Sequence, residues 1–131
     1  MTMDAGTEWI VDASGCDPGA LRSIERLEEL FRQVIRDLEL TPVTPCAWHQ
    51  FPGAGGITGV VVLSESHLTC HTFPERGYAA LNLYCCRPRA AWPWEARLRE
   101  TLGAGDVSVH TLRRGTRATV STDRSGASPS G

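Results

Sequence analysis

The most informative absence in this sequence is lysine, because all 13 of its basic side chains are arginine. Schiff-base enzymes, including those that hold pyridoxal phosphate, use a lysine amine, and P-loop proteins place a lysine on the phosphates. A guanidinium group stays protonated and is not a nucleophile, so arginine does not replace lysine in these roles. The sequence therefore excludes these classes of mechanism.

Long apolar runs and a clustered positive charge are missing as well. The longest apolar stretch, residues 59–63, is far shorter than the roughly 20 residues that cross a bilayer, and residues 1–6 lack the features of a secretory signal. A net charge of −2 at pH 7 offers no basic face for nucleic acid. The five cysteines, with Cys85 and Cys86 adjacent, fit reduced thiols better than a disulfide framework. We therefore expect a cytoplasmic protein that binds neither nucleic acid nor a membrane.

Hydrophobic periodicity predicts two helices. Apolar residues recur at steps of three and four over residues 21–38, and Asp17 followed by Pro18 is typical of a helix N-cap and first helical residue. A second helix is expected over residues 94–102, where Gly103 would end it.

Runs of β-branched and aromatic residues between turn residues predict about five strands, most of them in an antiparallel meander. The expected strand segments are 7–12, 43–51, 57–66 followed by 67–73, 78–86 and 106–112. This order of elements predicts one α+β domain, a two-layer sandwich with a mainly antiparallel sheet and two helices on one face. The domain is expected to cover residues 1–114, with residues 115–131 as a disordered tail because they show no apolar periodicity.

Reactive side chains are concentrated in residues 64–86. This segment holds two of the four histidines, three of the five cysteines and two carboxylates. Because alternate residues of a strand share a face, His71 and Phe73 should lie together on one strand, with Cys86 on the matching face of the next. Pairing of these strands would place His71, Phe73 and Cys86 around one pocket beside Ser66, which would combine a base, a thiol and a nucleophile.

Other chemistries match these residues less well. The pairs Cys70-His71 and Cys85-Cys86 could bind zinc, but adjacent residues of a strand point to opposite faces, and structural zinc ligands are usually two to four residues apart. A hydrolase built on Ser66 would lack the Gly-x-Ser-x-Gly elbow. The glycine-rich loop 52–56 lacks the lysine and the following helix of a phosphate-binding loop. Cys70 and Cys85 are better explained as small core residues.

A longer motif runs through the same segment. It consists of Glu65-Ser66-His67-Leu68-Thr69, His71-Thr72-Phe73-Pro74-Glu75, Gly77-Tyr78-Ala79-Ala80 and Cys86. The motif resembles that of the bacterial S-adenosylmethionine decarboxylase proenzymes, pyruvoyl-dependent enzymes of spermidine synthesis. The similarity extends over about residues 9–115 and includes the Gly-Cys-Asp-Pro turn at 15–18, His-Gln-Phe-Pro at 49–52 and Trp-Pro-Trp at 92–94.

The resemblance implies that the chain cuts itself between Glu65 and Ser66. The Ser66 hydroxyl would attack the Glu65 carbonyl to form an ester, and elimination of this ester would leave a pyruvoyl group in place of Ser66. The products would be a β chain of residues 1–65 and an α chain of residues 66–131. Two such processed units are expected to pair as an αββα homodimer, with active sites near the interface.

The resemblance also assigns two residues to the cutting reaction itself. His71 matches the residue that transfers the proton, and imidazole is a suitable base near neutral pH. Thr58 lies where the family is expected to have a helper serine, so the hydroxyl is kept.

Substrate and cofactor roles follow from the same resemblance. The pyruvoyl group derived from the serine would accept the electrons released as carbon dioxide leaves the substrate, the role that pyridoxal phosphate fills elsewhere. Cys86 matches the residue that donates a proton to the substrate carbon, which suits a thiol. Glu75 matches the acid that holds the ribose hydroxyls. Phe51 and Phe73 are candidates for stacking on adenine, with packing in the core as the alternative.

Several positions depart from the form expected of the family. Phe73 stands in place of tryptophan, Arg76 in place of an aromatic residue and Asn82 in place of an acidic one, while cysteines occupy positions 70 and 85. The loss of a carboxylate and the added arginine would weaken attraction for a cationic sulfonium. Two alternatives therefore stay open: a pyruvoyl-dependent decarboxylase of another amino acid, such as ornithine or arginine, and a non-catalytic regulatory homologue.

Overall fold

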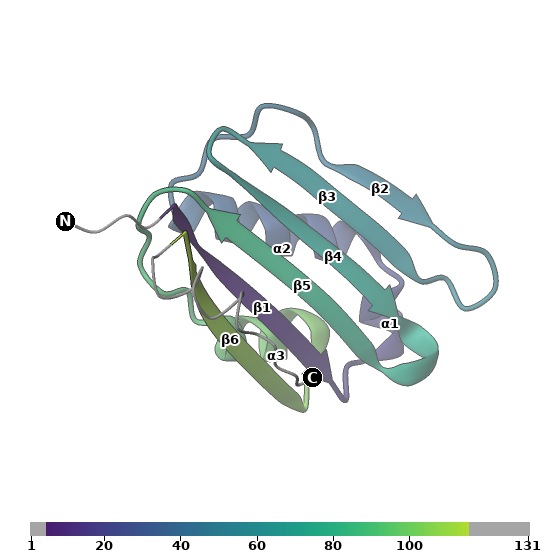
Figure 1. The fold of residues 1–131 in the computed structure, drawn as a ribbon. Helices are drawn as coiled ribbons and strands as arrows, with labels where there is room; N and C mark the ends of the chain where they lie inside the picture. Colours follow the sequence, from purple (N-terminus) through teal and green to yellow (C-terminus); the bar gives the residue numbers. More distant parts are fainter. Residues whose placement is uncertain (1–4, 116–131) are drawn as a thin grey trace, which may run out of the picture.

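The computed structural model describes residues 5–115, which form a six-stranded sheet with helices on one of its faces (Figure 1). The strand order is β2-β3-β4-β5-β1-β6, and every pairing is antiparallel. In chain order the elements are β1 (Gly6–Ser14), α1 (Pro18–Leu21), α2 (Ile24–Asp37), β2 (Ala47–Gln50), β3 (Ile57–Leu63), β4 (Ser66–Phe73), the 3-10 helix η1 (Pro74–Arg76), β5 (Tyr78–Cys85), α3 (Trp94–Leu102) and β6 (Asp106–Arg114). The predicted α+β sandwich is confirmed.

The strand bounds around the reactive segment differ from the prediction, which continued one strand as far as Ser66. Strand β3 ends at Leu63, the chain reverses at Ser64 and Glu65, and Ser66 opens β4 opposite Leu63. Two-residue hairpin loops are common, but a Ser-Glu loop carries no glycine, asparagine or proline that would announce it. Ser64 N donates a hydrogen bond to Thr41 O at 2.8 Å, which anchors the turn to the loop that follows α2.

Strand β2 is shorter than the predicted 43–51 and covers only Ala47–Gln50. Pro42 and Pro45 each lack a backbone N–H and cannot donate to a ladder, so regular pairing begins after them. Pro42 still forms an isolated bridge with Leu63.

The first predicted helix is divided in two. Asp17 caps α1 as expected, with its Oδ2 accepting from Ala20 N at 3.1 Å. Ser23 then caps α2 as a second N-cap, since its Oγ accepts from Arg26 N at 3.2 Å. The sequence pattern did not reveal this second start, because both helices share one apolar stripe. The helix α3 has the predicted bounds and ends at Gly103 in a left-handed conformation, φ 66°.

The core lies between the helices and one face of the sheet, as predicted. Its buried residues include Val11, Leu27, Phe31, Leu68 and Leu98, each at most 1% exposed. The opposite face of the sheet carries no helix formed by the described part of the chain (Figure 1). No helix within this part is long and apolar enough to cross a membrane. The predicted tail, apart from Gly115, lies outside the described residues.

Thr72 joins the two layers and provides a test of the packing. It is the only buried polar residue within residues 5–115, and its Oγ1 accepts from Ile57 N at 2.9 Å and donates to Leu21 O at 2.8 Å. Thr72→Val keeps the side-chain volume but leaves both backbone groups without a partner, so we expect a loss of about 2–4 kcal/mol in the free energy of unfolding.

The measurement is urea unfolding in a Ser66→Ala background, in which the expected self-cleavage cannot occur. Thr72→Ser is the matched control, because it keeps the hydroxyl and removes one methyl group, at a cost of about 1 kcal/mol. A valine variant as stable as the serine variant would contradict this role of the hydroxyl.

Candidate active site

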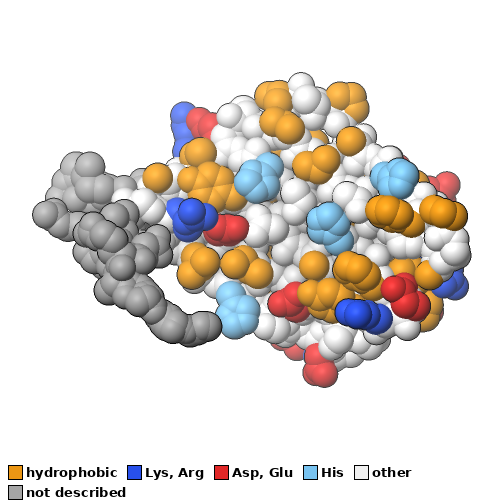
Figure 2. Space-filling view, turned by 45° about the vertical axis from the view of Figure 1, so that its right-hand side comes forward, with side chains coloured by type: hydrophobic (Ala, Val, Ile, Leu, Met, Phe, Trp, Pro, Cys, Tyr) orange, Lys and Arg blue, Asp and Glu red, His pale blue; other side chains and the backbone are white. Residues whose placement is uncertain are grey.

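Residues of β4 alternate between the two faces of the sheet as predicted. His67, His71 and Phe73 point to the face of the sheet that the helices leave uncovered within residues 5–115, which we call the open face. Leu68 and Cys70 are buried under the helices. Figure 2 shows that this face gathers the histidines of the chain, all four of which are visible in one view. The open face therefore carries titratable side chains, in contrast to the apolar helix-covered face.

The two cysteines predicted as core residues are buried. Cys70 and Cys85 are each 1% exposed. Burial raises the pKa of the Cys70 thiol to about 12 and also raises the pKa of the Cys85 thiol. Both thiols therefore stay protonated at neutral pH, which favours packing over chemistry for these two residues.

The expected cleavage point lies in the β3–β4 turn. Ser66 is the first residue of β4 and faces Cys85 of β5. Its Oγ is buried and makes no hydrogen bond of normal geometry among residues 5–115, but it lies close enough to the Cys85 thiol to lower the pKa of that thiol, against the larger effect of burial. The carbonyl oxygen of Glu65 accepts a hydrogen bond from the backbone N–H of Cys86 at 2.8 Å. The peptide bond between Glu65 and Ser66 thus has an adjacent free hydroxyl and a carbonyl that is already bound to a donor.

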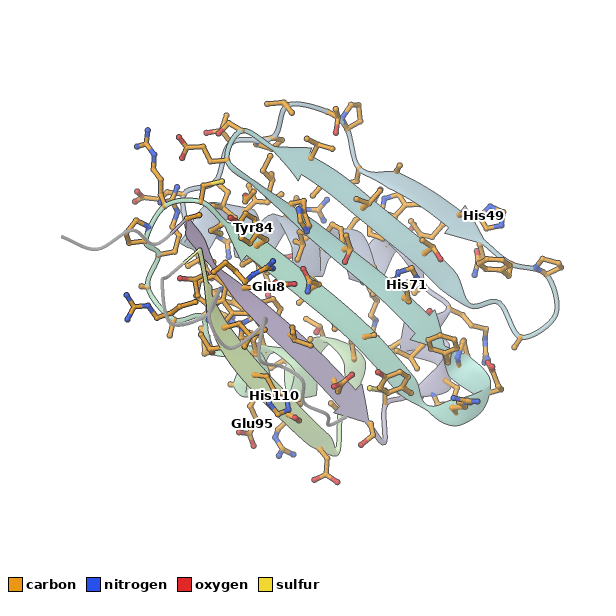
Figure 3. All side chains as sticks on the ribbon, viewed as in Figure 1. Glu8, His49, His71, Tyr84, Glu95 and His110 are labelled. Carbon is orange, nitrogen blue, oxygen red and sulfur yellow. The ribbon has the colours of Figure 1, made fainter. Side chains whose placement is uncertain are left out.

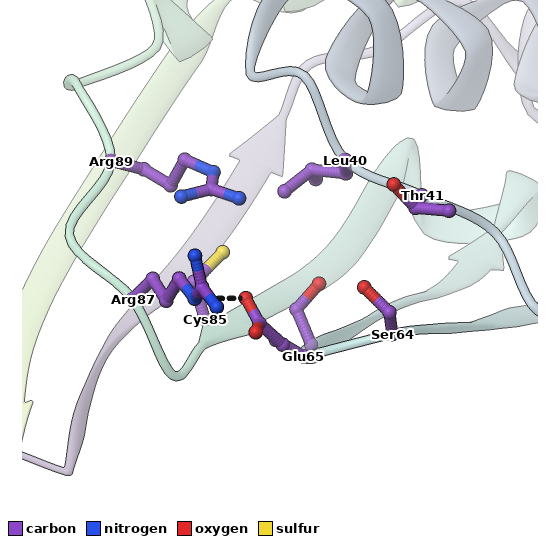
Figure 4. A pocket seen from close by; sticks show the side chains of 8 residues that line it. Leu40, Thr41, Ser64, Glu65, Cys85, Arg87 and Arg89 are labelled. Atoms are coloured by element: carbon purple, nitrogen blue, oxygen red, sulfur yellow. Dashed lines mark ion pairs between the residues drawn. The ribbon is translucent and has the colours of Figure 1, made fainter.

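A small cavity adjoins this turn (Figure 4). It is lined by residues that include Leu40, Glu65, Ser66, Cys85, Arg87 and Arg89, and its volume is about 10 Å³. Such a volume is at the lower limit for one water molecule. Arg87 Nε lies 2.7 Å from Glu65 Oε1, an ion pair at the mouth of the turn. We call Glu65, Ser66 and Cys86 the cleavage end of the sheet.

The other predicted processing residues lie together elsewhere. Thr58 of β3 faces His71 of β4, and Thr58 Oγ1 lies 3.2 Å from His71 Nδ1 on the open face. The hydroxyl of position 58 and the imidazole of position 71, both assigned to the cutting reaction by the resemblance, are thus neighbours on this face. Figure 3 shows His71 toward the η1 end of β4. We call Thr58, His71, Phe51, Phe73 and Glu75 the histidine end of the sheet.

The two candidate stacking residues are exposed. Phe51 is 51% exposed and meets the His49 ring edge-on, with centroids 4.5 Å apart. Phe73 is 36% exposed and stacks on Tyr78, with centroids 5.6 Å apart and planes at 28°. The alternative that these phenylalanines belong to the core is therefore wrong. Glu75 lies in η1 next to Phe73 and is also exposed.

The expected single pocket is not formed within one chain. His71 follows Ser66 by five positions along an extended strand, a distance of about 16 Å at roughly 3.3 Å per residue. The Ser66 side chain also shares the helix-covered face with Leu68, whereas His71 points to the open face. The strand pairing confirms the shared faces, but it places the serine and the histidine at opposite ends of β4.

Sequence reasoning missed one charged group on the open face. Glu8 of β1 accepts a hydrogen bond from Asn82 Nδ2 at 2.7 Å and forms an ion pair with Arg114 at 2.6 Å (Figure 3). The hydrogen bond from Asn82 is the largest cause that lowers the pKa of the Glu8 carboxyl, and Arg114 acts in the same direction. A carboxylate is thus present beside position 82, where the family form was expected to carry its own. The alternation of Glu8 with buried Trp9 was the signal that could have revealed it.

Comparison with known proteins finds similarity to S-adenosylmethionine decarboxylases. The family model for S-adenosylmethionine decarboxylase matches residues 7–115. The S-adenosylmethionine decarboxylase proenzyme of Pelotomaculum thermopropionicum is 36% identical over 112 residues, which are 84% of this chain and 86% of that protein. The proenzyme of the same name from Caldicellulosiruptor saccharolyticus is 37% identical over 112 residues, 84% of this chain and 88% of that protein.

A solved structure agrees with these relatives. The crystal structure of the adenosylmethionine decarboxylase from Aquifex aeolicus matches with a TM-score of 0.69 and 26% identity, and the match covers 86% of this chain and 92% of that chain. The resemblance predicted from the motif is confirmed.

The Glu8 network predicts a pH-dependent contribution to stability. Because the pKa of Glu8 is lower in the folded protein than in the unfolded chain, its carboxylate stabilises the fold above the usual glutamate value of about 4.3. This stabilisation is lost as the pH falls through the folded-state pKa. Glu8→Gln should therefore be less stable than its parent at pH 7, and the difference should shrink below pH of about 4.

Urea unfolding from pH 7 to pH 3, again with Ser66→Ala as the parent, measures this difference. Glu95→Gln is the control, because Glu95 forms an exposed ion pair with Arg99 on α3, and such pairs contribute little. A difference between Glu8→Gln and its parent that is independent of pH would contradict the assignment.

Proposed function

Because the chain belongs to the S-adenosylmethionine decarboxylase family, we propose that it decarboxylates S-adenosylmethionine with a pyruvoyl group made from its own Ser66. The observation that carries this proposal is the geometry of the β3–β4 turn. The Glu65 carbonyl oxygen is held 2.8 Å from Cys86 N, next to a buried Ser66 hydroxyl that has no hydrogen-bond partner in the described part of the chain. The product would serve spermidine synthesis.

Self-cleavage starts from groups that are already adjacent. Ser66 Oγ attacks the carbonyl carbon of Glu65, the peptide C–N bond breaks and an ester forms in its place. Negative charge that develops on the carbonyl oxygen is stabilised by the Cys86 N–H, a donor that needs no reorganisation. Loss of the Ser66 α-proton and of the ester oxygen then gives dehydroalanine, and water replaces ammonia to leave the pyruvoyl group. The chain is divided into residues 1–65 and 66–131.

The residues around Ser66 fit a pyruvoyl group. An electron-accepting carbonyl at this position supplies the chemistry that lysine-bound pyridoxal phosphate supplies elsewhere, so the absence of lysine is no obstacle. The Cys86 thiol is exposed directly after β5, beside the cleavage point, and is assigned to donate a proton to the substrate carbon.

Substrate recognition is assigned to exposed groups of the open face. Glu75 offers a carboxylate to the ribose diol, and the exposed rings of Phe51 and Phe73 offer flat surfaces to adenine. The Glu8 carboxylate lies beside Asn82, where the family form was expected to carry its own acid, but its charge is paired with that of Arg114.

A second copy of the chain completes the site in this proposal. Ser66 and His71 lie about 16 Å apart along β4, too far for direct proton transfer within one chain. We infer that a two-fold axis between two open faces brings the histidine end of one chain to the edge of the sheet where the other chain has its β3–β4 turn. Because the Ser66 side chain points to the helix-covered face, this turn has to rearrange before the serine meets the partner's histidine end. The apolar side chains Val62, Phe73 and Leu112, which are 36–47% exposed on this sheet, suit such an interface. The protein is therefore proposed to work as a homodimer of processed units.

Intact-mass measurement tests the cleavage. The purified protein should yield two fragments that meet between Glu65 and Ser66, with residues 66–131 blocked at the N-terminus. Ser66→Ala should remain a single chain, because it lacks the attacking oxygen. A wild-type chain that stays at 14.3 kDa after long incubation would contradict self-processing.

Release of carbon dioxide from different amino acids tests the substrate. We expect turnover of S-adenosylmethionine and none of ornithine or arginine, since the exposed phenylalanines and Glu75 suit a nucleoside. Turnover of ornithine or arginine, without turnover of S-adenosylmethionine, would favour a pyruvoyl-dependent decarboxylase of another amino acid. A processed chain that turns over none of the three would favour a non-catalytic regulatory homologue.

Mixed dimers test the shared site. Ser66→Ala and His71→Gln chains with different tags should each fail to mature alone. When they are co-expressed, a mixed dimer contains one complete site. The His71→Gln chain supplies Ser66 to this site, and the Ser66→Ala chain supplies His71. The His71→Gln chain should therefore be cut only in the mixed sample. Isolated mixed dimers in which that chain stays whole would contradict the shared site.

A further inference from the structure

Two buried polar atoms in the cavity beside the β3–β4 turn have no hydrogen-bond partner among residues 5–115. They are Ser66 Oγ and Arg89 Nε, and both residues line the same cavity (Figure 4). Buried polar atoms are rarely left without a partner, because the loss of hydration is costly. The unpartnered Arg89 Nε, in the same cavity as the Ser66 hydroxyl, therefore indicates that a hydrogen-bond acceptor for this nitrogen forms there during the reaction.

The neighbouring arginine is already occupied. Arg87 Nε pairs with the side-chain carboxylate of Glu65 at 2.7 Å. Among residues 5–115, the hydrogen bond that Arg89 makes is a local one, from its Nη1 to the backbone oxygen of Pro88 at 3.0 Å. The uncut turn thus has one guanidinium group on the Glu65 carboxylate and a second, that of Arg89, lining the same cavity. Cleavage after Glu65 creates a second carboxylate, the new C-terminus of the first fragment, at the same place.

We propose that Arg89 binds the α-carboxylate that Glu65 acquires when the chain splits, and that it thereby stabilises the leaving group of the elimination step. This inference rests on the proposed self-cleavage at Ser66. In that step a base removes the Ser66 α-proton, the C–H electron pair forms the Cα=Cβ bond, and the Cβ–Oγ bond breaks. Its electron pair stays on the oxygen, so the departing Glu65 carries a full negative charge on two oxygens.

One of these two oxygens already has a donor, and the other lies in the cavity that Arg89 lines without a hydrogen bond to it. One is the original carbonyl oxygen, 2.8 Å from Cys86 N. The other is the former Ser66 Oγ, which lies in the cavity that Arg89 lines. A guanidinium group is the side chain best matched to a carboxylate, and its charge strengthens the hydrogen bond as the oxygen becomes negative.

The small size of the cavity also limits the access of water to the ester. A space of about 10 Å³ scarcely admits one water molecule. Hydrolysis of the ester would return a serine N-terminus without a carbonyl. So small a cavity, lined in part by the Arg89 side chain, favours elimination over hydrolysis, and so the formation of the pyruvoyl group.

Hydroxylamine trapping separates ester formation from elimination. Hydroxylamine cuts an accumulated ester to give a Glu65 hydroxamate and a free Ser66 amine, and mass spectrometry distinguishes these ends from the self-cut carboxylate and pyruvoyl ends. In Arg89→Gln the ester should still form, but its elimination should slow by about tenfold to hundredfold, the effect of losing one charge-assisted hydrogen bond. Arg89→Lys should show a smaller delay, since it keeps the charge.

Matched variants keep the outcomes distinct. Arg99→Gln removes an exposed arginine of α3 that pairs with Glu95, and it should mature at the wild-type rate. Elimination at the wild-type rate in Arg89→Gln would overturn the role of Arg89. If Arg89→Gln does not fold by circular dichroism, the lysine variant decides, and a wild-type rate there overturns the proposal. Failure of the wild-type chain itself to split would instead overturn the proposed function.

Discussion

The hydrogen bond from the Cys86 N–H to the Glu65 carbonyl oxygen holds the β3–β4 turn against the end of β5. A short two-residue loop forces Ser66 into the first position of β4, and the bond fixes the carbonyl beside it. The Ser66 hydroxyl thereby lies at a small cavity on the helix-covered side of the sheet. The bond that would break, the attacking oxygen and the donor for the negative charge are all set by backbone pairing, so they do not depend on mobile side chains.

The alternation of a β-strand imposes the second constraint. Because β4 runs straight from Ser66 to Phe73, the serine and His71 cannot meet within one chain. A larger protein could bring them together with a long loop, but here every connection around β4 is short. The sheet face that no helix of residues 5–115 covers carries the histidines and exposed apolar side chains, and it is where we propose that a partner chain supplies what one chain lacks. In this proposal a small fold gains a complete site by pairing with itself.

The sequence was most informative where local chemistry is strong. Asp17 and Gly103 mark helix ends through a cap and a left-handed residue, and the alternation of β4 predicted its buried and exposed faces. The turn at Ser64 and the second cap at Ser23 were missed, because their residues carry weak turn and helix signals. The motif identified the family, but periodicity alone placed His71 and the serine in one pocket, since it says nothing about distance along a strand.

The long-range contacts could not be predicted from the sequence at all. The pairing of Glu8 with Asn82 joins residues 74 positions apart, and it depends on the order in which the strands assemble. The cavity shared by Ser66 and Arg89 likewise depends on the path of the chain after β5. The contact with Glu8 shows that the carboxylate expected at position 82 is replaced by one on the neighbouring strand β1.

The most direct test of the central claim is the reaction of the purified protein with phenylhydrazine, followed by mapping of the label. A chain that makes its own carbonyl should take up one label per 66–131 fragment, as a hydrazone at the position of Ser66. A fragment that begins with an unlabelled serine amine, or an uncut chain without label, would contradict the account.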